Sequence, residues 1–250
     1  MTLAASLLTA GGLALIGHAA GWLTRGGAIA AAVVGGVILG FGGIPGFVVL
    51  SFLFLSGSLL TYGRARRPSE GSGPGRTWRQ VVANGGVAAV GALLIAHSPN
   101  LGWAVLTGAI AAALADTWGT EIGARARRPP RLIISGRPVP PGTSGGITLL
   151  GTVAGILGAG LLGCLAAIMG IPAASALTGT VGGVAGTLGD SLLGATVQGM
   201  YRCDACGEDT ERSVHRCGST SRLVRGYQWI DNDVVNLLAT AIGAAVAVVF

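Results

Sequence analysis

Two aspartates, Asp116 and Asp190, stand inside stretches of the chain that are otherwise apolar. A charged side chain at membrane depth costs at least about 2.5–3.5 kcal/mol on insertion scales, so an ionisable residue there indicates a functional site. The two settings are alike, because Leu-Ala-Asp-Thr at 114–117 resembles Leu-Gly-Asp-Ser at 188–191. Carboxylates in such a pair are typical ligands of Mg²⁺. A structural ion pair with an arginine is the alternative.

Further oxygen-bearing side chains could join this site. The last apolar stretch opens with four of them, which are Asp231, Asn232, Asp233 and Asn236. Asp231 and Asp233 are predicted to assist the first two aspartates in holding Mg²⁺. Glu121 follows Asp116 by five residues, which places it about 140° further round an ideal helix. Both carboxylates can face one site only if the helix unwinds near Gly119.

A glycine-rich turn precedes the sixth apolar stretch and contains Thr143, Ser144, Gly145 and Gly146. A turn of this composition that opens a helix presents unpaired backbone N–H groups and the positive end of the helix dipole, which together bind anions. Arg137 precedes it closely, and a guanidinium suits phosphate oxygens. An ordinary helix start is the alternative.

Gln80 and Asn84 are further candidates for contact with a phosphate or a nucleotide. They are four residues apart and therefore share a helix face. An asparagine near a helix start is also a common cap, which is the simpler interpretation.

Three of the four cysteines and one histidine fall within a short polar segment. They are Cys203, Cys206, His215 and Cys217. Three cysteines and a histidine at this spacing predict a tetrahedral structural zinc site. Disulfides are the alternative, but three cysteines cannot all pair within the segment, and a cytoplasmic face is reducing.

The composition places these residues in a membrane protein. Hydrophobic residues make up 51% of the chain and charged residues 10%, and the mean hydropathy is +0.68. The 45 glycines often follow small-xxx-small spacing, as at Gly36 with Gly40 and Gly179 with Gly183, which lets membrane helices approach closely. Eight apolar stretches are candidate spans: 3–23, 27–43, 45–62, 81–96, 101–122, 145–169, 173–200 and 234–250.

We therefore predict an all-α integral membrane protein, a single polytopic domain over residues 1–250 with six to eight transmembrane helices. Eight is the preferred number. A Pro/Gly break at 44–46 could instead make the second and third stretches a re-entrant pair, which would lower the count. All 16 basic residues are arginine, and with eight spans every arginine falls on one side. The positive-inside rule makes that side cytoplasmic.

Three polar loops then face the cytoplasm: a basic loop at 63–80, a phosphate-site loop at 123–144 and the Cys/His loop at 201–230. The first apolar stretch lacks the basic start of a cleavable signal, so we expect none. The arginines are scattered through short loops without interleaved aromatic residues, which argues against a nucleic-acid partner. A homo-oligomer is left open.

The order and spacing of these motifs resemble a known family. The motifs are Gln-Val-Val-Ala-Asn-Gly at 80–85, Asp-Thr-Trp-Gly-Thr-Glu-Ile-Gly at 116–123, Pro-Gly-Thr-Ser-Gly-Gly at 141–146, Gly-Asp-Ser-Leu-Leu-Gly-Ala-Thr at 189–196, the cysteine loop, and Trp-Ile-Asp-Asn-Asp-Val-Val-Asn at 229–236. They are similar to those of the integral membrane family that includes plant phytyl-phosphate kinase. Ser144 departs from the pattern, because the resemblance leads us to expect Asp or Asn there. The layout is more distantly similar to dolichol kinases and CDP-diacylglycerol synthases, which use CTP.

The resemblance implies a membrane enzyme that transfers phosphate from a nucleoside triphosphate, with CTP preferred over ATP, to an isoprenoid monophosphate such as phytyl or geranylgeranyl phosphate. It implies catalytic roles for Asp116, Glu121, Asp190 and Arg137, and phosphate or nucleotide contacts for Gln80, Asn84, Thr143, Ser144, Gly145, Gly146, Ser191, Asn232 and Asn236. The alternatives are a cytidylyltransferase that forms a CDP-lipid and, in another class, an ion-coupled transporter. The similar segments around the two aspartates run in the same direction across the predicted membrane, which argues against an inverted transporter repeat.

Overall fold

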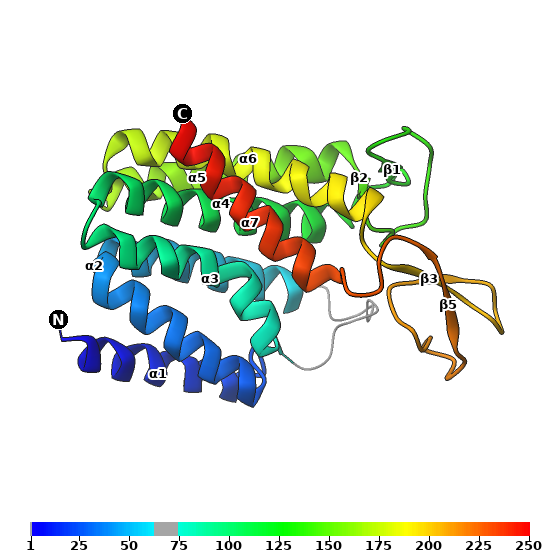
Figure 1. Ribbon diagram of the computed structural model, residues 1–250, viewed down its shortest axis with the longest axis horizontal. Coiled ribbons are helices and arrows are strands. Elements are labelled where there is room, and N and C mark those ends of the chain that lie inside the picture. Colours follow the sequence, from blue (N-terminus) through cyan, green and yellow to red (C-terminus); the bar gives the residue numbers. More distant parts are fainter. Residues whose placement is uncertain (1, 63–74) are drawn as a thin grey trace.

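The structure, a computed structural model, describes residues 2–62 and 75–250. Residues 63–74 of the predicted basic loop therefore lie outside the described residues. The helices run in the order α1 (Leu3–Ala19), α2 (Arg25–Tyr62), α3 (Trp78–Ile95), α4 (Pro99–Gly123), α5 (Leu149–Ile168), α6 (Ala173–Thr196) and α7 (Asn232–Val249). The long axes of these helices lie roughly side by side, so the helices form one bundle (Figure 1).

Helix α2 is broken and folds back on itself at Gly43, whose φ of 60° and ψ of −162° are not helical. A positive φ is readily adopted only by glycine, and Pro45 two residues later cannot continue a helical hydrogen-bond ladder. The aromatic rings of Trp22, just before α2, and Phe54, near its end, lie 6.1 Å apart. The break predicted at 44–46 is thus present, and it separates two legs of one element.

Helix α4 runs through the core of the bundle, where it packs against α3, α5, α6 and α7. Every residue from 106 to 115 is buried. Small side chains and glycines allow this, because an added Cβ at Gly91 of α3 would lie only 2.6 Å from the Leu106 backbone nitrogen. Asp116 is therefore the first residue after a fully buried stretch.

The prediction of a helical integral membrane protein is confirmed. Five helices of the described chain, namely α2, α3, α4, α5 and α7, are long and apolar enough to cross a membrane, and α1 is a shorter apolar helix. Exposed leucines and isoleucines such as Leu8, Leu149 and Ile168 cover the outside of the bundle, as expected for a surface that contacts lipid. The number of crossings stays a prediction.

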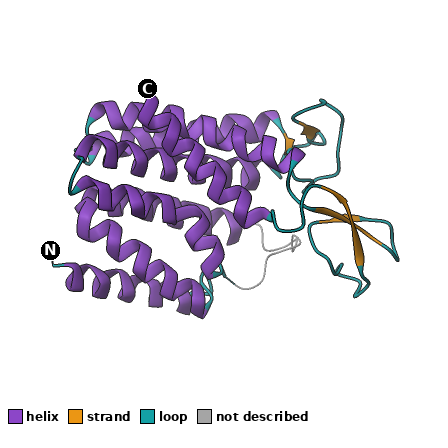
Figure 2. Ribbon diagram, in the orientation of Figure 1, coloured by secondary structure: helices purple, strands orange, loops and turns teal. Residues whose placement is uncertain are grey.

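The polar loops gather at one end of the bundle, opposite both termini (Figures 1 and 2). One loop contains a two-stranded antiparallel sheet of β1 (Arg131–Leu132) and β2 (Gly146–Ile147). The other contains a three-stranded antiparallel sheet in the order β4-β3-β5, with β3 (Met200–Cys203), β4 (Asp209–Thr210) and β5 (Ser221–Arg225). These strands were not predicted.

Two predicted boundaries are wrong for the same reason. The sixth stretch was expected to begin at 145, but α5 begins at Leu149, because residues 146–147 pair with β1 and Thr148 caps the helix by accepting a hydrogen bond from the Gly151 N–H. The seventh was expected to reach 200, but α6 ends at Thr196 and Met200 already belongs to β3. Local pairing in the loops therefore shortens both helices at the polar end.

Candidate functional site

The two aspartates that stand in apolar stretches of the sequence lie close together. Asp116 lies on α4 and Asp190 on α6, and their carboxyl groups are close enough for the charge of one to act on the other. The two helices can approach this closely because small residues line the contact: an added Cβ at Gly183 would lie 2.7 Å from the Ala111 Cβ, and one at Gly186 would overlap Ala112. The sequence analysis predicted both acids, and the fold brings them together.

This acid pair has the features of a cation site. Two facing carboxylates repel each other unless a cation or a shared proton lies between them. The Oδ2 atom of Asp190 is buried and has no hydrogen-bond partner among the described residues. Because a buried polar atom without a partner is costly, this oxygen suits a bound ligand. The donor set, two carboxylates at the polar end of a bundle, fits Mg²⁺.

A third carboxylate, Glu211, approaches the pair from the Cys/His loop. It accepts a hydrogen bond from the Ser144 hydroxyl and lies close enough for its charge to act on Asp190. The turn that contains Ser144 packs directly on the end of α6, since an added Cβ at Gly145 would meet the Ala195 backbone. Ser144 thus lies at the site, although the family resemblance led us to expect Asp or Asn at this position. Sequence reasoning missed Glu211, because an acid in a charged loop carries no distinguishing signal.

Two other unpartnered polar groups lie at the same end of α6. Gln198 is 2% exposed, yet its Nε2 atom has no hydrogen-bond partner in the described part of the chain. Arg225 donates a hydrogen bond from Nη2 to the Gly194 carbonyl at 2.9 Å, and its buried Nε likewise has no partner there. Both are N–H donors one to two turns beyond Asp190, and a phosphate oxygen is an acceptor of the right kind. Their roles were not predicted.

The predicted backbone anion site in the glycine-rich turn is not formed at a helix start. The Thr143 N–H donates to the Pro140 carbonyl and the Gly146 N–H to the Thr143 carbonyl, so these donors serve the turn itself. The Thr143 hydroxyl also donates to the Pro140 carbonyl, at 2.8 Å. Two N–H groups of the turn are therefore used within it, and phosphate contacts of Thr143, Ser144, Gly145 and Gly146 stay predictions. Arg137 is exposed beside it.

Glu121 does not join Asp116, because α4 continues without unwinding to Gly123. Its carboxylate accepts a hydrogen bond from the Thr61 hydroxyl at 2.9 Å, and its charge acts on Arg76. The condition for a shared site of Asp116 and Glu121 is therefore not met. Glu121 belongs to the contact between α4 and α2.

The acids at the start of α7 are engaged with Arg79. Asp231 lies 2.6 Å and Asp233 3.5 Å from the Arg79 guanidinium, and Asp231 caps α7 by accepting a hydrogen bond from the Val234 N–H. No contact of either acid with Asp116 or Asp190 is recorded in the described ranges. Of the other candidates, Asn232 and Asn236 lie in the first turns of α7 and Ser191 follows Asp190 on α6. Their assigned roles stay predictions.

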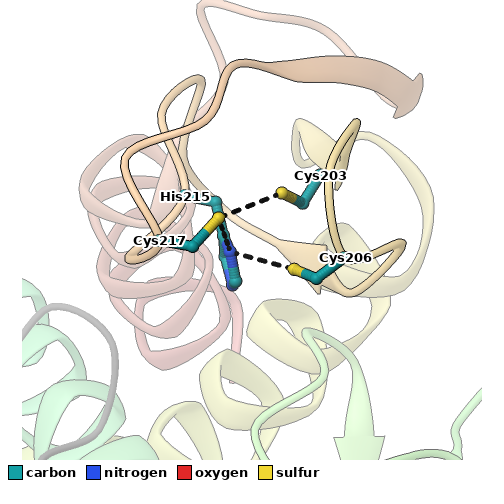
Figure 3. A group of neighbouring side chains, drawn as sticks. All are labelled: Cys203, Cys206, His215 and Cys217. Atoms are coloured by element: carbon teal, nitrogen blue, oxygen red, sulfur yellow. Dashed lines mark hydrogen bonds between the residues drawn. The ribbon is translucent and has the colours of Figure 1, made fainter.

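The Cys/His loop brings its four candidate ligands together. The Sγ atoms of the three cysteines and a ring nitrogen of His215 all lie within 4.8 Å of one another (Figure 3). The His215 Nδ1 is 3.3 Å from the Cys206 Sγ and 3.2 Å from the Cys217 Sγ. On the far side of the ring, Nε2 lies 3.4 Å from the Glu208 carboxylate, the arrangement that commonly orients a metal-binding histidine.

The local backbone favours a thiolate at Cys203. The backbone N–H groups of Cys206 and Ala205 lower the pKa of the Cys203 thiol to about 6, although burial opposes them. A thiolate is the form that binds zinc. The geometry and donor set therefore fit the predicted tetrahedral Zn²⁺ site, which would tie β3, β4 and the following turn into one unit.

We expect the purified protein to contain about one zinc per chain, because three thiolates and one imidazole complete a tetrahedral shell. Cys206→Ser should lose this zinc and lower the melting temperature, because metal binding and loop folding are coupled. Metal analysis and thermal unfolding measure both effects, with Cys164→Ser, outside the cluster, as the matched control. A wild-type protein prepared without chelator and free of zinc would contradict the expectation.

Comparison with known proteins gives one family. A family model described as "Integral membrane protein DUF92" matches residues 8–244. The Uncharacterized membrane protein MJ0933 of Methanocaldococcus jannaschii is 32% identical over 229 residues, which cover 89% of this chain and 83% of the relative. Protein PGR of Arabidopsis thaliana is 28% identical over 246 residues, which cover 79% and 83%.

A shorter match joins the chain to a second plant protein. Protein VTE6, chloroplastic, of Arabidopsis thaliana is 29% identical over 136 residues, which cover 54% of this chain and 34% of the relative. No solved structure matches the chain significantly. The family suggested by the order and spacing of the motifs is confirmed.

Proposed function

Because the chain belongs to the DUF92 family of integral membrane proteins, we propose that it is a membrane-embedded prenyl-phosphate kinase. It would transfer a phosphoryl group from a nucleoside triphosphate, CTP in the first instance, to an isoprenoid monophosphate such as phytyl or geranylgeranyl phosphate. The observation that carries the proposal is the facing pair Asp116 and Asp190 with its unpartnered buried oxygen. The partial similarity to VTE6, from the family that includes plant phytyl-phosphate kinase, supports it.

The chemistry needs positioning and charge neutralisation rather than a strong base, because the acceptor is already an anionic phosphate. Mg²⁺, held by Asp116 and Asp190, would neutralise charge on the donor phosphates. The N–H groups of Gln198 and Arg225 would donate to phosphate oxygens at the end of α6. Ser144 is oriented by Glu211 and closes this end of the site.

The zinc loop would have a positioning role. Glu211 follows β4 directly, and β4 belongs to the sheet that also contains Cys203. A loop fixed by Zn²⁺ would therefore hold Glu211 and Arg225 over the end of α6 with little entropy lost on substrate binding. In the predicted topology all arginines fall on one side of the membrane, and the positive-inside rule assigns that side to the cytoplasm. The site would then face the compartment in which nucleoside triphosphates are present.

The test is product identification. Purified protein with Mg²⁺ is incubated with a panel of prenyl monophosphates and labelled CTP or ATP. A kinase gives a prenyl diphosphate and a nucleoside diphosphate, whereas a cytidylyltransferase gives a CDP-lipid and pyrophosphate. Release of pyrophosphate with a CDP-lipid, or no lipid product from any pair of substrates, would contradict the proposal.

A further inference from the structure

A cavity of about 230 Å³ lies among α1, the two legs of α2 and α3. Most of its wall is apolar, with side chains such as Leu50, Leu53 and Phe54. Leu13, Ile16 and Leu55 also line it, and they are exposed on the outside of the bundle. The cavity is therefore open toward the surface that contacts lipid, and a hydrocarbon chain could enter it without passing through water.

One end of this cavity is polar and contains a half-buried positive charge. Arg76, Gln80, Asn84 and Thr117 line it there. Two backbone hydrogen bonds hold Arg76 in place. Its N–H donates to the Trp22 carbonyl at 2.8 Å, and its carbonyl accepts a hydrogen bond from the Thr24 N–H at 3.1 Å. Its guanidinium carbon lies 5.3 Å from the centre of the Phe54 ring.

In the described part of the chain, the negative charge that acts on Arg76 is that of Glu121. Burial lowers the pKa of Arg76, and the charge of Glu121 opposes this shift. A guanidinium nevertheless stays protonated in a protein, so the cavity keeps a cation at its polar end. The Glu121 carboxylate is also engaged by the Thr61 hydroxyl. A doubly charged phosphate monoester would suit the remaining positive potential.

The Gln80 amide at this end is oriented as a donor. The Gln80 side-chain oxygen is committed to the helix cap, where it accepts from the Thr77 N–H at 2.9 Å. Its NH₂ group is therefore the part that a ligand can use. The Asn84 amide, one turn further along α3, lies on the same face.

We propose that this cavity binds the acceptor lipid, with the hydrocarbon chain of one prenyl monophosphate among α1, α2 and α3 and its phosphate on Arg76, Gln80 and Asn84. This inference rests on the proposed function for the identity of the lipid. Thr117 lines the cavity and directly follows Asp116, so the bound phosphate would lie beside the segment of α4 that carries Asp116. The site would separate acceptor binding, between α2 and α3, from donor binding, at the end of α6.

Photolabelling tests the site without any need for turnover. The purified full chain in nanodiscs is irradiated with a prenyl monophosphate that carries a diazirine in its chain, in EDTA and without nucleotide. Labels are expected on cavity-lining residues of α1, α2 and α3. Unlabelled prenyl monophosphate should compete, whereas the prenyl alcohol and phosphatidic acid at equal concentration should compete much less.

Two pairs of variants sharpen the test. Ala31→Phe fills the cavity and should reduce labelling by about tenfold, as expected when one ring displaces part of a buried chain. Val33→Phe, on the exposed side of the same leg, should label like wild type. Arg76→Gln should weaken competition by the monophosphate about tenfold, the loss expected for one charge-assisted contact, and Arg76→Lys should restore part of it.

Labelling confined to α5 and α6, or labelling unchanged in Ala31→Phe, would overturn the proposal. Equal competition by phosphatidic acid would assign the cavity to bulk phospholipid and overturn it as well. Cavity labelling with the expected variant effects, in a protein that makes no prenyl diphosphate, would support the lipid site and refute the kinase. Prenyl-diphosphate formation without cavity labelling would support the kinase and refute the lipid site.

Discussion

Replacing Asp116 or Asp190 by asparagine is expected to lower turnover per folded molecule by about 10²–10³-fold. The amide keeps the side-chain volume and removes the charge of the ligand, so the helix contact should survive while charge stabilisation of the transition state is lost. A loss of about 3–4 kcal/mol, as for one oxyanion-type contact, corresponds to that rate effect. The buried and unpartnered Oδ2 of Asp190 is the reason to expect a ligand role rather than a packing role.

The measurement is prenyl-phosphate turnover per folded molecule with Mg²⁺ varied, for wild type and both variants. Asp209→Asn serves as the control, because Asp209 pairs with Arg202 on the exposed sheet, 2.9 Å away. A structural role for the pair predicts the opposite pattern. Asparagine would then insert more readily than aspartate, and activity would follow only the amount of folded protein. Near-normal turnover in both variants would remove the acids from the mechanism.

The sequence predicted the acid pair because each aspartate conflicts with its surroundings. A carboxylate in an apolar helix has a large free-energy cost, and that cost is visible without any structure. The Cys/His set was equally visible, since the spacing of its residues alone limits the chemistry. The fold brings both groups together, and it confirms the Pro/Gly break between the legs of α2.

The sequence did not show which polar residues of the loops belong to a ligand site. Arg76 and Arg225 look like the other arginines, and only their partial burial distinguishes them as groups that could bind a ligand. Glu211 reaches Ser144 across 67 residues of chain, a contact set by tertiary folding. The turn at 141–146 was expected to start a helix, but pairing of Gly146 with Leu132 uses its backbone differently. Non-local pairing of this kind leaves no local pattern in the sequence.

The spacing of glycines in the sequence predicts close helix packing, but only the structure shows which glycines lie at the tightest contacts. Gly182 on α6 faces α7, where an added Cβ would run into the Gly243 carbonyl oxygen. Gly160 on α5 has no atom within 4 Å of the same added carbon. Both residues are glycines within apolar helices and look equivalent in the sequence. Only at Gly182 are two helix backbones too close to leave room for a methyl group.

Gly182→Ala is therefore expected to destabilise the protein by about 1–3 kcal/mol, the usual range for an extra methyl group in a packed interior. Because a backbone carbonyl cannot move aside as a side chain can, α6 and α7 must separate, and Asp190 on α6 should shift away from Asp116. Gly160→Ala should be neutral or mildly stabilising, since alanine favours a helix over glycine by about 1 kcal/mol. Thermal unfolding in detergent, with turnover measured on the same samples, tests the opposite signs. Equal melting temperatures for the two variants would show that the close approach of α6 and α7 at Gly182 does not limit the stability of the fold.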